Sequence, residues 1–231
     1  RRLSLRITRL VWQCIANKLA SLCIDAQAVH LDFVEFHLSY QDLLLFPRDF
    51  IQGEQKMFFS VHAPELYAGD HILDLCSSDE VYRKASIDHL KRVVDHCSLI
   101  EKCFPEQSSP ILVLNAGGWS KDGFLNNKDK QECYDILKAS LIEANAVSVQ
   151  IAIQTMPPFP WHFGGQRYQN LFVHADEIVK YCKKLNLRMC FDISHSQLMC
   201  NHFNIDFYQF CEVVAPITGH LHLGDASGVN G

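Results

Sequence analysis

The sequence CFDISH occupies residues 190–195, and GHLHLGD occupies residues 219–225. Each stretch is a short apolar run that ends in Asp or His, which are side chains from which proteins build metal sites. Asp192 and His195 stand three residues apart where the first run ends, and His222 ends the second run. Parallel strands that finish in such residues predict a metal site at the open face of a barrel. The alternative is that these histidines only satisfy hydrogen bonds within a core.

The chain of 231 residues is long enough for one large domain or two small ones. Hydrophobic residues make up 48% and charged residues 20%, which is ordinary for a globular protein. A net charge of -5 offers no broad basic surface, which argues against a nucleic-acid partner but leaves room for a locally basic cleft. No apolar run approaches the roughly 18 residues that span a bilayer, so we expect no membrane segment. Residues 6–22 have a helical period without a following cleavage site, which predicts an amphipathic helix rather than a signal peptide.

The chain has ten cysteines, and their positions indicate the compartment. Cys97 and Cys182 fall at apolar positions of helical patterns, and Cys190 lies within an apolar strand. No CxxC pair or cluster suggests a zinc knuckle or a secreted disulfide framework. We therefore expect buried, hydrophobic cysteines in a reducing cytoplasm.

Six apolar runs have the length and composition of buried strands. They lie at residues 33–38, 57–62, 111–114, 147–154, 188–193 and 217–223. Helical patterns lie between them at residues 79–103, 128–146, 174–185 and 204–214. The strands are continuous rather than alternating apolar runs, which indicates a parallel sheet covered on both faces. No repeat or linker-like change in composition divides the chain, so residues 1–231 are predicted to form one α/β domain.

Polar side chains gather where each predicted strand ends. They are His37, His62, Asn115, Gln154, Asp192 with His195, and His222 with Asp225. A doubly wound sheet concentrates its site at one switch point, whereas a barrel recruits nearly every strand end. Because all six strands contribute, the pattern favours a (β/α)8 TIM barrel.

These residues resemble the xylose-isomerase-like barrel superfamily, which contains sugar isomerases, sugar epimerases and endonuclease IV. The resemblance covers residues 31–231 and rests on Asp192-x-x-His195, on His222-x-x-Asp225 and, more weakly, on Val61-His62-Ala63-Pro64. In that family the ends of the fifth to eighth strands supply a Glu, an Asp, a His and a final Glu to a metal. The resemblance implies that Asp192 and His222 are two of these ligands. It also implies that His195 binds a second metal, as in the nucleases, or contacts substrate, as in the isomerases.

The chain departs from the family pattern in two ways. Gln154 stands where the family usually has a bridging Glu, and its amide oxygen can ligate a hard cation but cannot act as a general base. The resemblance also implies that only barrel strands two to seven are present, without the first and eighth strands and the last Glu. Such a barrel would have two edge strands without a neighbouring strand, so we expect the chain to be part of a longer polypeptide.

The resemblance favours a metal-dependent sugar or sugar-phosphate isomerase or epimerase, acting alone or as a module of a carbohydrate-biosynthesis enzyme. A divalent ion (Mn, Mg, Zn or Co) would be held by Asp192, His222, Gln154 and His195. His195, Glu35 and His62 would move protons between adjacent carbons. The residues expected to bind the substrate are His37, Asn115, Trp119, His162, Arg167 and Asp225. We expect a small carbohydrate as substrate, a cytoplasmic location, and homo-oligomers or attached domains as partners.

Two other functions stay open from the sequence. A nuclease of the endonuclease IV type needs three zinc ions, but Asn115 replaces a second His and Gln154 replaces the bridging Glu. A barrel without that Glu could instead have lost catalysis and bind a sugar or act as a scaffold.

Overall fold

The computed structural model describes residues 23–24, 26, 30–162 and 165–229. The helix predicted over residues 6–22 lies outside these described residues. Within the described part of the chain, no helix is long and apolar enough to cross a membrane.

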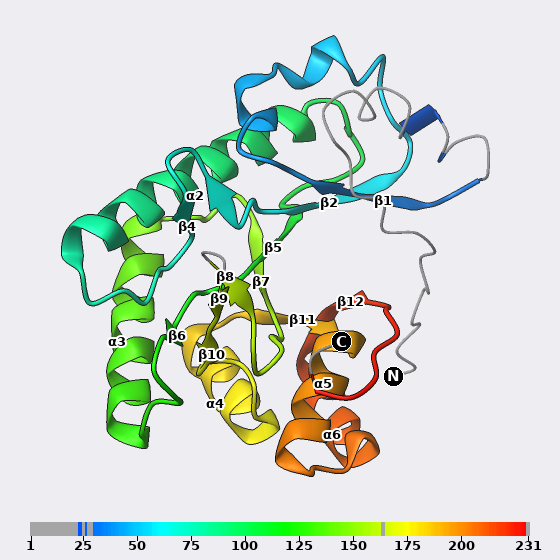
Figure 1. Ribbon diagram of the computed structural model, residues 1–231. Coiled ribbons are helices and arrows are strands. Elements are labelled where there is room, and N and C mark those ends of the chain that lie inside the picture. Colours follow the sequence, from blue (N-terminus) through cyan, green and yellow to red (C-terminus); the bar gives the residue numbers. More distant parts are fainter. Residues whose placement is uncertain (1–22, 25, 27–29, 163–164, 230–231) are drawn as a thin grey trace.

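Six parallel strands form one sheet in the order in which they occur along the chain. They are β1 (Phe33–His37), β2 (Phe58–His62), β5 (Ile111–Leu114), β7 (Gln150–Gln154), β11 (Arg188–Asp192) and β12 (Thr218–His222). The sheet curls into an incomplete barrel in which β1 and β12 form the two edges (Figure 1). The prediction of a parallel barrel built from strands in sequential order is therefore confirmed.

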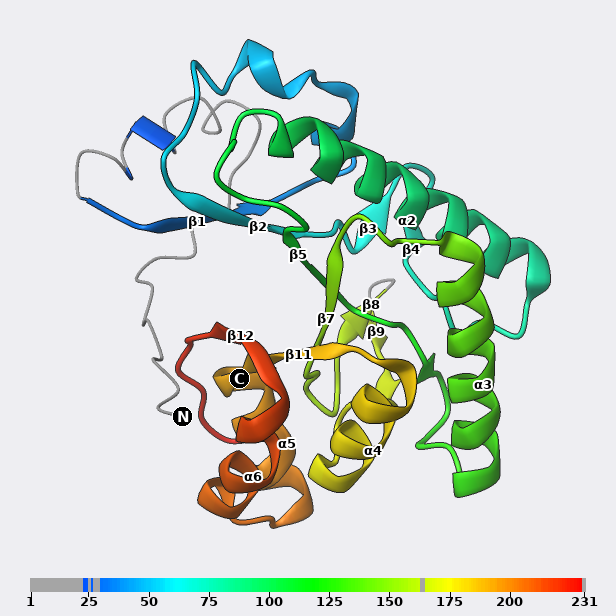
Figure 2. The same ribbon diagram turned by 180° about the vertical axis from the view of Figure 1, so that it is seen from behind.

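The helices lie outside the curled sheet, as both views show (Figures 1 and 2). They are α2 (Glu80–Glu101), α3 (Asn127–Ala144), α4 (Ala175–Leu185), α5 (Ile193–Phe203) and α6 (Phe207–Val214). Each crossover between parallel strands must span the sheet, which is why segments of this length separate the strands. Apolar residues at helical spacing on α2, among them Ile87, Leu90 and Val94, are buried against the sheet and its neighbours.

One helix was not predicted. The sequence pattern predicts a strand over residues 188–193 and no helix before residue 204, but α5 begins directly at Ile193. Asp192 has extended backbone and its Oδ1 accepts a hydrogen bond from the His195 amide at 2.9 Å, which is an N-cap. The prediction was wrong here, and the signal for the helix is Asp192 itself, because Asp is a favoured N-cap residue as well as a metal ligand.

Short elements decorate the loops. The two-stranded ribbons pair β3 (Leu66–Tyr67) with β4 (His71–Ile72), β6 (Trp119–Ser120) with β10 (Tyr168–Gln169), and β8 (Trp161–His162) with β9 (Gly165–Gln166). The short 3-10 helices are η2 (Asp42–Leu44), η3 (Pro47–Asp49) and η4 (Ala215–Ile217). None of these changes the order of the main sheet.

The inside of the curled sheet differs from its outside. The main hydrophobic core lies between strands and helices, whereas the interior contains a small separate cluster of Val113, Ala152 and Cys190. Side chains on a strand alternate between its two faces, so residues at even spacing from Cys190 and Ala152 also point inward. Near the carboxyl ends those inward positions carry polar groups, which places the candidate site within the barrel mouth.

Candidate active site

Glu35 of β1 lies inside the barrel among side chains that bond both of its oxygens, and only 4% of its surface is exposed. Its Oε1 accepts hydrogen bonds from the Nε2 atoms of His37 at 2.6 Å and His222 at 2.9 Å. Its Oε2 accepts one from Ser60 Oγ at 2.7 Å and lies 2.5 Å from His220 Nε2. Burial opposes ionisation of Glu35, but the bonds from the three histidines outweigh it and hold its pKa far below the ordinary value. Glu35 is therefore a fixed negative charge.

A second chain of hydrogen bonds crosses from β2 to β11. His62 Nε2 lies 2.9 Å from Gln154 Oε1, and Gln154 Nε2 donates to Asp192 Oδ2 at 2.8 Å. Gln154 Nε2 also lies 3.2 Å from His222 Nδ1. The amide of Gln154 thus joins the two halves of the mouth.

The two carboxylate oxygens of Asp192 have different roles, since one caps a helix and the other faces the site. Oδ1 accepts from the His195 amide at 2.9 Å and from Ser194 Oγ at 2.7 Å, which caps α5. Oδ2 faces His222 Nδ1 at 3.5 Å and His195 Nδ1 at 3.5 Å. Burial would raise the pKa of Asp192, yet the bonds with His222 and the proximity of His195 hold it well below its usual range. Asp192 therefore presents one ionised oxygen to the mouth.

His222 lies between the two carboxylates. Burial disfavours its protonated form, but the bonds to Asp192, Cys190 and Glu35 raise the pKa of His222 to about 12. These bonds favour the imidazolium form of the ring, in which both nitrogens carry a proton and Nε2 donates to Glu35 Oε1. A metal at Nδ1 would replace one of these protons, because a ligating imidazole must give up its hydrogen at the ligating atom.

The geometry between Asp192 and His222 fits a divalent ion. Ligands that share an ion through bonds of about 2.1 Å lie roughly 3 to 4 Å apart, and Oδ2 and Nδ1 are 3.5 Å apart. The two side chains are therefore already spaced as a ligand pair.

The tautomer of His62 bears on the third ligand, Gln154. His62 Nδ1 lies 2.9 Å from the Ala63 carbonyl oxygen, which can only accept, so Nδ1 carries the hydrogen. Burial, together with nearby His37, lowers the pKa of His62 and favours the neutral ring, whose Nε2 then has a lone pair facing Gln154 Oε1. Two acceptors thus face each other, and rotation of the Gln154 amide by half a turn would let its Nε2 donate to His62 Nε2 instead. It would place Oε1 beside Asp192 Oδ2, where two oxygens are stable only with a cation between them.

The structure brings most of the predicted site residues together. They are Glu35, His37, His62, Gln154, Asp192, His195 and His222. The rings of His37 and His62 are stacked with centroids 4.6 Å apart. These side chains come from β1, β2, β7, β11, β12 and the first turn of α5, so nearly every strand end contributes.

The other predicted residues lie in the surrounding loops. Asn115 and Trp119 line a separate small pocket with Met156 and Gln169, and Asn115 Nδ2 donates to Glu65 Oε1. Asp225 is exposed in the segment after β12. His162 belongs to β8, and Arg167 lies between β9 and β10 with Nη1 donating to the Gln166 carbonyl oxygen.

Three residues of the site were not predicted, namely Cys190, His220 and Ser60. All three occupy inward positions two residues before Asp192, His222 and His62. The two-residue period of a strand is the signal that could have found them, because it places both members of each pair on one face.

An incomplete parallel barrel with histidines and carboxylates at the carboxyl ends of its strands defines the class to which this chain belongs. The sequence pattern of the family described as xylose isomerase-like TIM barrel matches residues 26–231. The chain belongs to this family.

Proteins similar to this chain include one relative by sequence and several solved structures with a similar fold. An uncharacterized protein of Methanocaldococcus jannaschii is 24% identical over 217 residues, which cover 87% of this chain and 67% of the relative. The crystal structure of a D-tagatose 3-epimerase-like protein is 20% identical, with a TM-score of 0.58, over 90% of this chain and 73% of that chain. The structure of an L-ribulose 3-epimerase is 13% identical, with a TM-score of 0.62, over 93% of this chain and 67% of that chain. The crystal structure of endonuclease IV from Thermus thermophilus is 13% identical, with a TM-score of 0.56, over 93% of this chain and 74% of that chain. At these identities the structures establish the shared fold.

Proposed function

We propose that this protein is a metal-dependent isomerase or epimerase of a sugar or sugar phosphate. The observation that carries the proposal is the position of His222, whose Nε2 bonds Glu35 Oε1 at 2.9 Å and whose Nδ1 faces Asp192 Oδ2 at 3.5 Å. This arrangement places a metal-competent pair within a mouth that also contains His62 and His195. The family and the sugar epimerases among its structural relatives support the same class of reaction.

Asp192, Gln154 and His222 would hold the ion, with His195 beside them. When bound, a divalent ion such as Mn, Mg, Zn or Co polarises a substrate carbonyl and stabilises the negative charge that develops on its oxygen. The Gln154 amide would present Oε1 to the ion and donate from Nε2 to His62, which fixes the His62 tautomer.

His195 is our candidate for moving the substrate proton. Its Nδ1 lies 3.0 Å from the Thr155 carbonyl oxygen, so that nitrogen carries the hydrogen and Nε2 has the lone pair of the neutral ring. Its side chain is 29% exposed, whereas that of Asp192 is 9% exposed. His195 is thus the accessible base at the rim of the site.

Glu35 and His62 would act differently from a simple acid–base pair. Three histidines keep Glu35 ionised, so its role is to orient the rings of His37 and His222 rather than to exchange a proton near neutral pH. Burial favours the neutral form of His62, whose Nδ1 is bonded to the Ala63 carbonyl oxygen and whose Nε2 faces Gln154, so its role would be to orient the Gln154 amide. Substrate contacts are proposed for His37, Asn115, Trp119, His162, Arg167 and Asp225.

The test is exchange of a substrate proton with solvent. The protein is incubated in D2O with Mn²⁺ or Co²⁺ and a panel of ketoses, aldoses and their phosphates, and deuterium incorporation is followed by NMR. We expect exchange at a carbon next to the carbonyl of one sugar, and loss of that exchange in Asp192→Asn and His195→Gln. Asp135→Asn, an exposed carboxylate on α3, is the matched control and should keep the activity. An absence of exchange with every sugar, from folded protein that binds the ion, would rule out the proposed reaction.

A second function has a specific observation in its favour. Gln154 Nε2 donates to Asp192 Oδ2 at 2.8 Å and lies 3.2 Å from His222 Nδ1, so the amide nitrogen occupies the position that a shared ion would take. In this arrangement the amide replaces the ion, and the barrel binds a sugar or acts as a scaffold without catalysis. Binding of a sugar, measured by calorimetry, that is equal with and without Mn²⁺ and unaffected by Asp192→Asn would favour this second function.

A further inference from the structure

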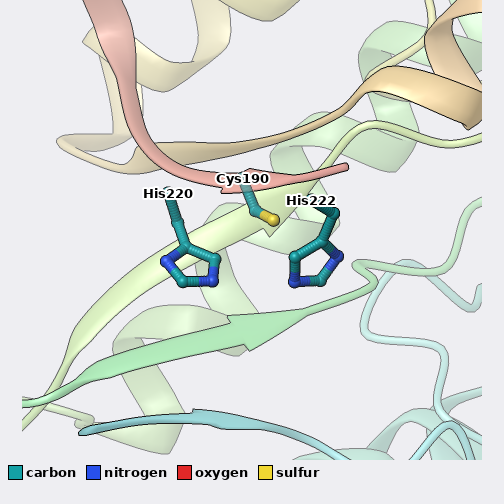
Figure 3. A group of neighbouring side chains, drawn as sticks. All are labelled: Cys190, His220 and His222. Carbon is teal, nitrogen blue, oxygen red and sulfur yellow. The ribbon is translucent and has the colours of Figure 1, made fainter. Parts of the chain in front are cut away.

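A second group of side chains that can ligate a metal lies deeper in the barrel, two residues before Asp192 and His222 on their strands. Cys190 of β11 and His220 of β12 are paired neighbours in the sheet and precede Asp192 and His222 by two residues. Both therefore face the interior, and Cys190 belongs to the small interior cluster with Val113 and Ala152. Figure 3 shows the Cys190 sulfur between the rings of His220 and His222, with all three side chains on one side of the two strands.

The donor atoms of this group converge. One ligand atom each from Cys190, His220 and His222 all lie within 4.8 Å of one another. The Nε2 atoms of His220 and His222 also meet the same carboxylate, Glu35, at 2.5 Å and 2.9 Å. The carboxylate oxygens of Glu35 are therefore a fourth donor beside the two rings.

We propose that Cys190 Sγ, His220 Nε2, His222 Nε2 and a Glu35 oxygen form a tetrahedral site for a thiophilic divalent ion of the Zn²⁺ type. One thiolate, two imidazoles and one carboxylate are the ligand kinds that Zn²⁺ takes in four-coordinate sites. Mg²⁺ and Mn²⁺ prefer oxygen ligands, so the sulfur selects against them.

The distances require only a small adjustment. Ligands at 2.0–2.3 Å from a tetrahedral ion lie roughly 3.3–3.8 Å apart. The ligand atoms of Cys190, His220 and His222, which lie within 4.8 Å of one another, would move closer together. The Glu35 oxygens, which lie 2.5 Å and 2.9 Å from the two Nε2 atoms, would move slightly away from the rings. Binding of the ion would displace the Nε2 hydrogens through which His220 and His222 bond Glu35, and the thiol proton of Cys190, all of which would go to solvent.

The surroundings suit a buried cation. Cys190 is fully buried and Glu35 is 4% exposed, and a thiolate with a carboxylate would balance the two positive charges of the ion. Val113 and Ala152 are apolar residues of the same interior cluster, so the site would contain little water beyond its ligands. Such an enclosed site is typical of a structural ion rather than of one that exchanges with substrate.

This site does not rest on the proposed reaction. It would use Nε2 of His222, whereas the pair at the mouth uses Nδ1 and Asp192. Loss of the mouth pair by Asp192→Asn therefore leaves the complete deeper donor set in place.

The experiment is a titration of the whole, metal-stripped chain with Co²⁺, followed by visible and near-ultraviolet absorption. We expect one equivalent to give the intense d–d bands of tetrahedral cobalt and a sulfur-to-cobalt charge-transfer band, both removed by one equivalent of Zn²⁺. Cys190→Ser, Cys190→Ala and His220→Gln should lose the charge-transfer band or bind Zn²⁺ about 100-fold or more weakly. Asp192→Asn should keep the band.

Cys182→Ser is the matched control, because Cys182 is equally buried but lies on α4 outside the barrel interior. Circular dichroism shows which variants are folded. Because three different substitutions remove a ligand, the test can still be made if one of them does not fold. A charge-transfer band that persists in folded Cys190→Ala, or that disappears in Cys182→Ser, would overturn the site. Failure of the folded parent chain to bind Co²⁺ with sulfur would overturn it as well. None of these results depends on turnover of a sugar, so failure of this site and failure of the proposed reaction are distinguishable.

Discussion

Glu35 and His222 are joined by a 2.9 Å hydrogen bond although 187 residues separate them in the sequence. They belong to β1 and β12, which are the two edge strands of the sheet in the described part of the chain. His220 makes a second link from β12 to the same carboxylate at 2.5 Å. Side chains inside the barrel thus connect two edges that no backbone hydrogen bonds join in the described sheet.

The first prediction follows from this link. Glu35→Gln should lower the free energy of unfolding by about 3–5 kcal/mol, because removal of one partner leaves buried histidine charge unpaired. Urea denaturation followed by tryptophan fluorescence measures the change. Glu143→Gln removes an exposed partner of Lys84 and should change the stability far less, because solvent screens that ion pair. Equal stability of the two variants would mean that the interior link does not hold the edges together.

The second prediction concerns pH in the presence of a chelator. The folded-state pKa values of Glu35 and Asp192 lie below their ordinary values of 4.5 and 3.8, so their stabilisation is present above those values and is lost as the pH falls. The folded-state pKa of His222 is raised from 6.5 to about 12, so its contribution is full below pH 6.5 and is lost as the pH rises toward 12. Stability should therefore be greatest near pH 5–6.5 and decline on both sides.

Thermal unfolding between pH 3 and pH 10 tests this dependence. His222→Gln should flatten the alkaline decline, because the ring that loses its proton on unfolding is absent. His30→Gln, at an exposed turn position just before β1, serves as the control and should keep the parent profile. An alkaline decline that is unchanged in His222→Gln would assign it to other groups.

The sequence predicted the sheet and the mouth well because both depend on local patterns. Apolar runs marked the strands, and parallel strands bring their carboxyl ends to one edge, so Asp192 and His222 were expected together and lie 3.5 Å apart. The position of Gln154 between them also followed from the end of its own strand. Strand 147–154 was predicted too long, since β7 begins at Gln150 after a turn that follows α3.

Other features depend on contacts that periodicity does not contain. Asn115 directly follows β5, but its side chain bonds Glu65 in a loop. Cys190 lies within an apolar run, which predicts a buried hydrophobic residue, but its side chain lies beside the histidines of β12. The bonds from Glu35 to His220 and His222 join the two ends of the described sheet, and no short sequence window includes both.

The third prediction separates the two roles of Asp192. Asp192→Asn keeps a side-chain oxygen that can cap α5 but removes the charge that faces His222, whereas Asp192→Ala removes both. We expect both variants to lose Mn²⁺ binding, and Asp192→Ala to be less stable than Asp192→Asn by about 0.5–2 kcal/mol. Asp206→Ala, which removes the N-cap of α6, should have a similar effect on stability without affecting metal binding. Equal stability of the two Asp192 variants would contradict a capping role.

The last prediction concerns Gln154, which decides between catalysis and a barrel that has lost it. The carboxylate of Gln154→Glu would add a negative charge beside Asp192 Oδ2 and His222 Nδ1, the atoms that Gln154 Nε2 now approaches at 2.8 Å and 3.2 Å. Binding of Mn²⁺ should tighten by about one to a few kcal/mol, because a carboxylate is a stronger ligand than an amide oxygen. Isothermal titration calorimetry on the parent and the variant measures the difference.

The control for this experiment lies on the same strand. Gln150 begins β7 and is exposed, so Gln150→Glu adds the same charge at a distance from the mouth and should leave Mn²⁺ affinity unchanged. Asp192→Ala should abolish binding in either background, since Oδ2 is then absent. If the parent and Gln154→Glu are equally unable to bind Mn²⁺, the mouth is a relic of a metal site, and the amide of Gln154 has replaced the ion between Asp192 and His222.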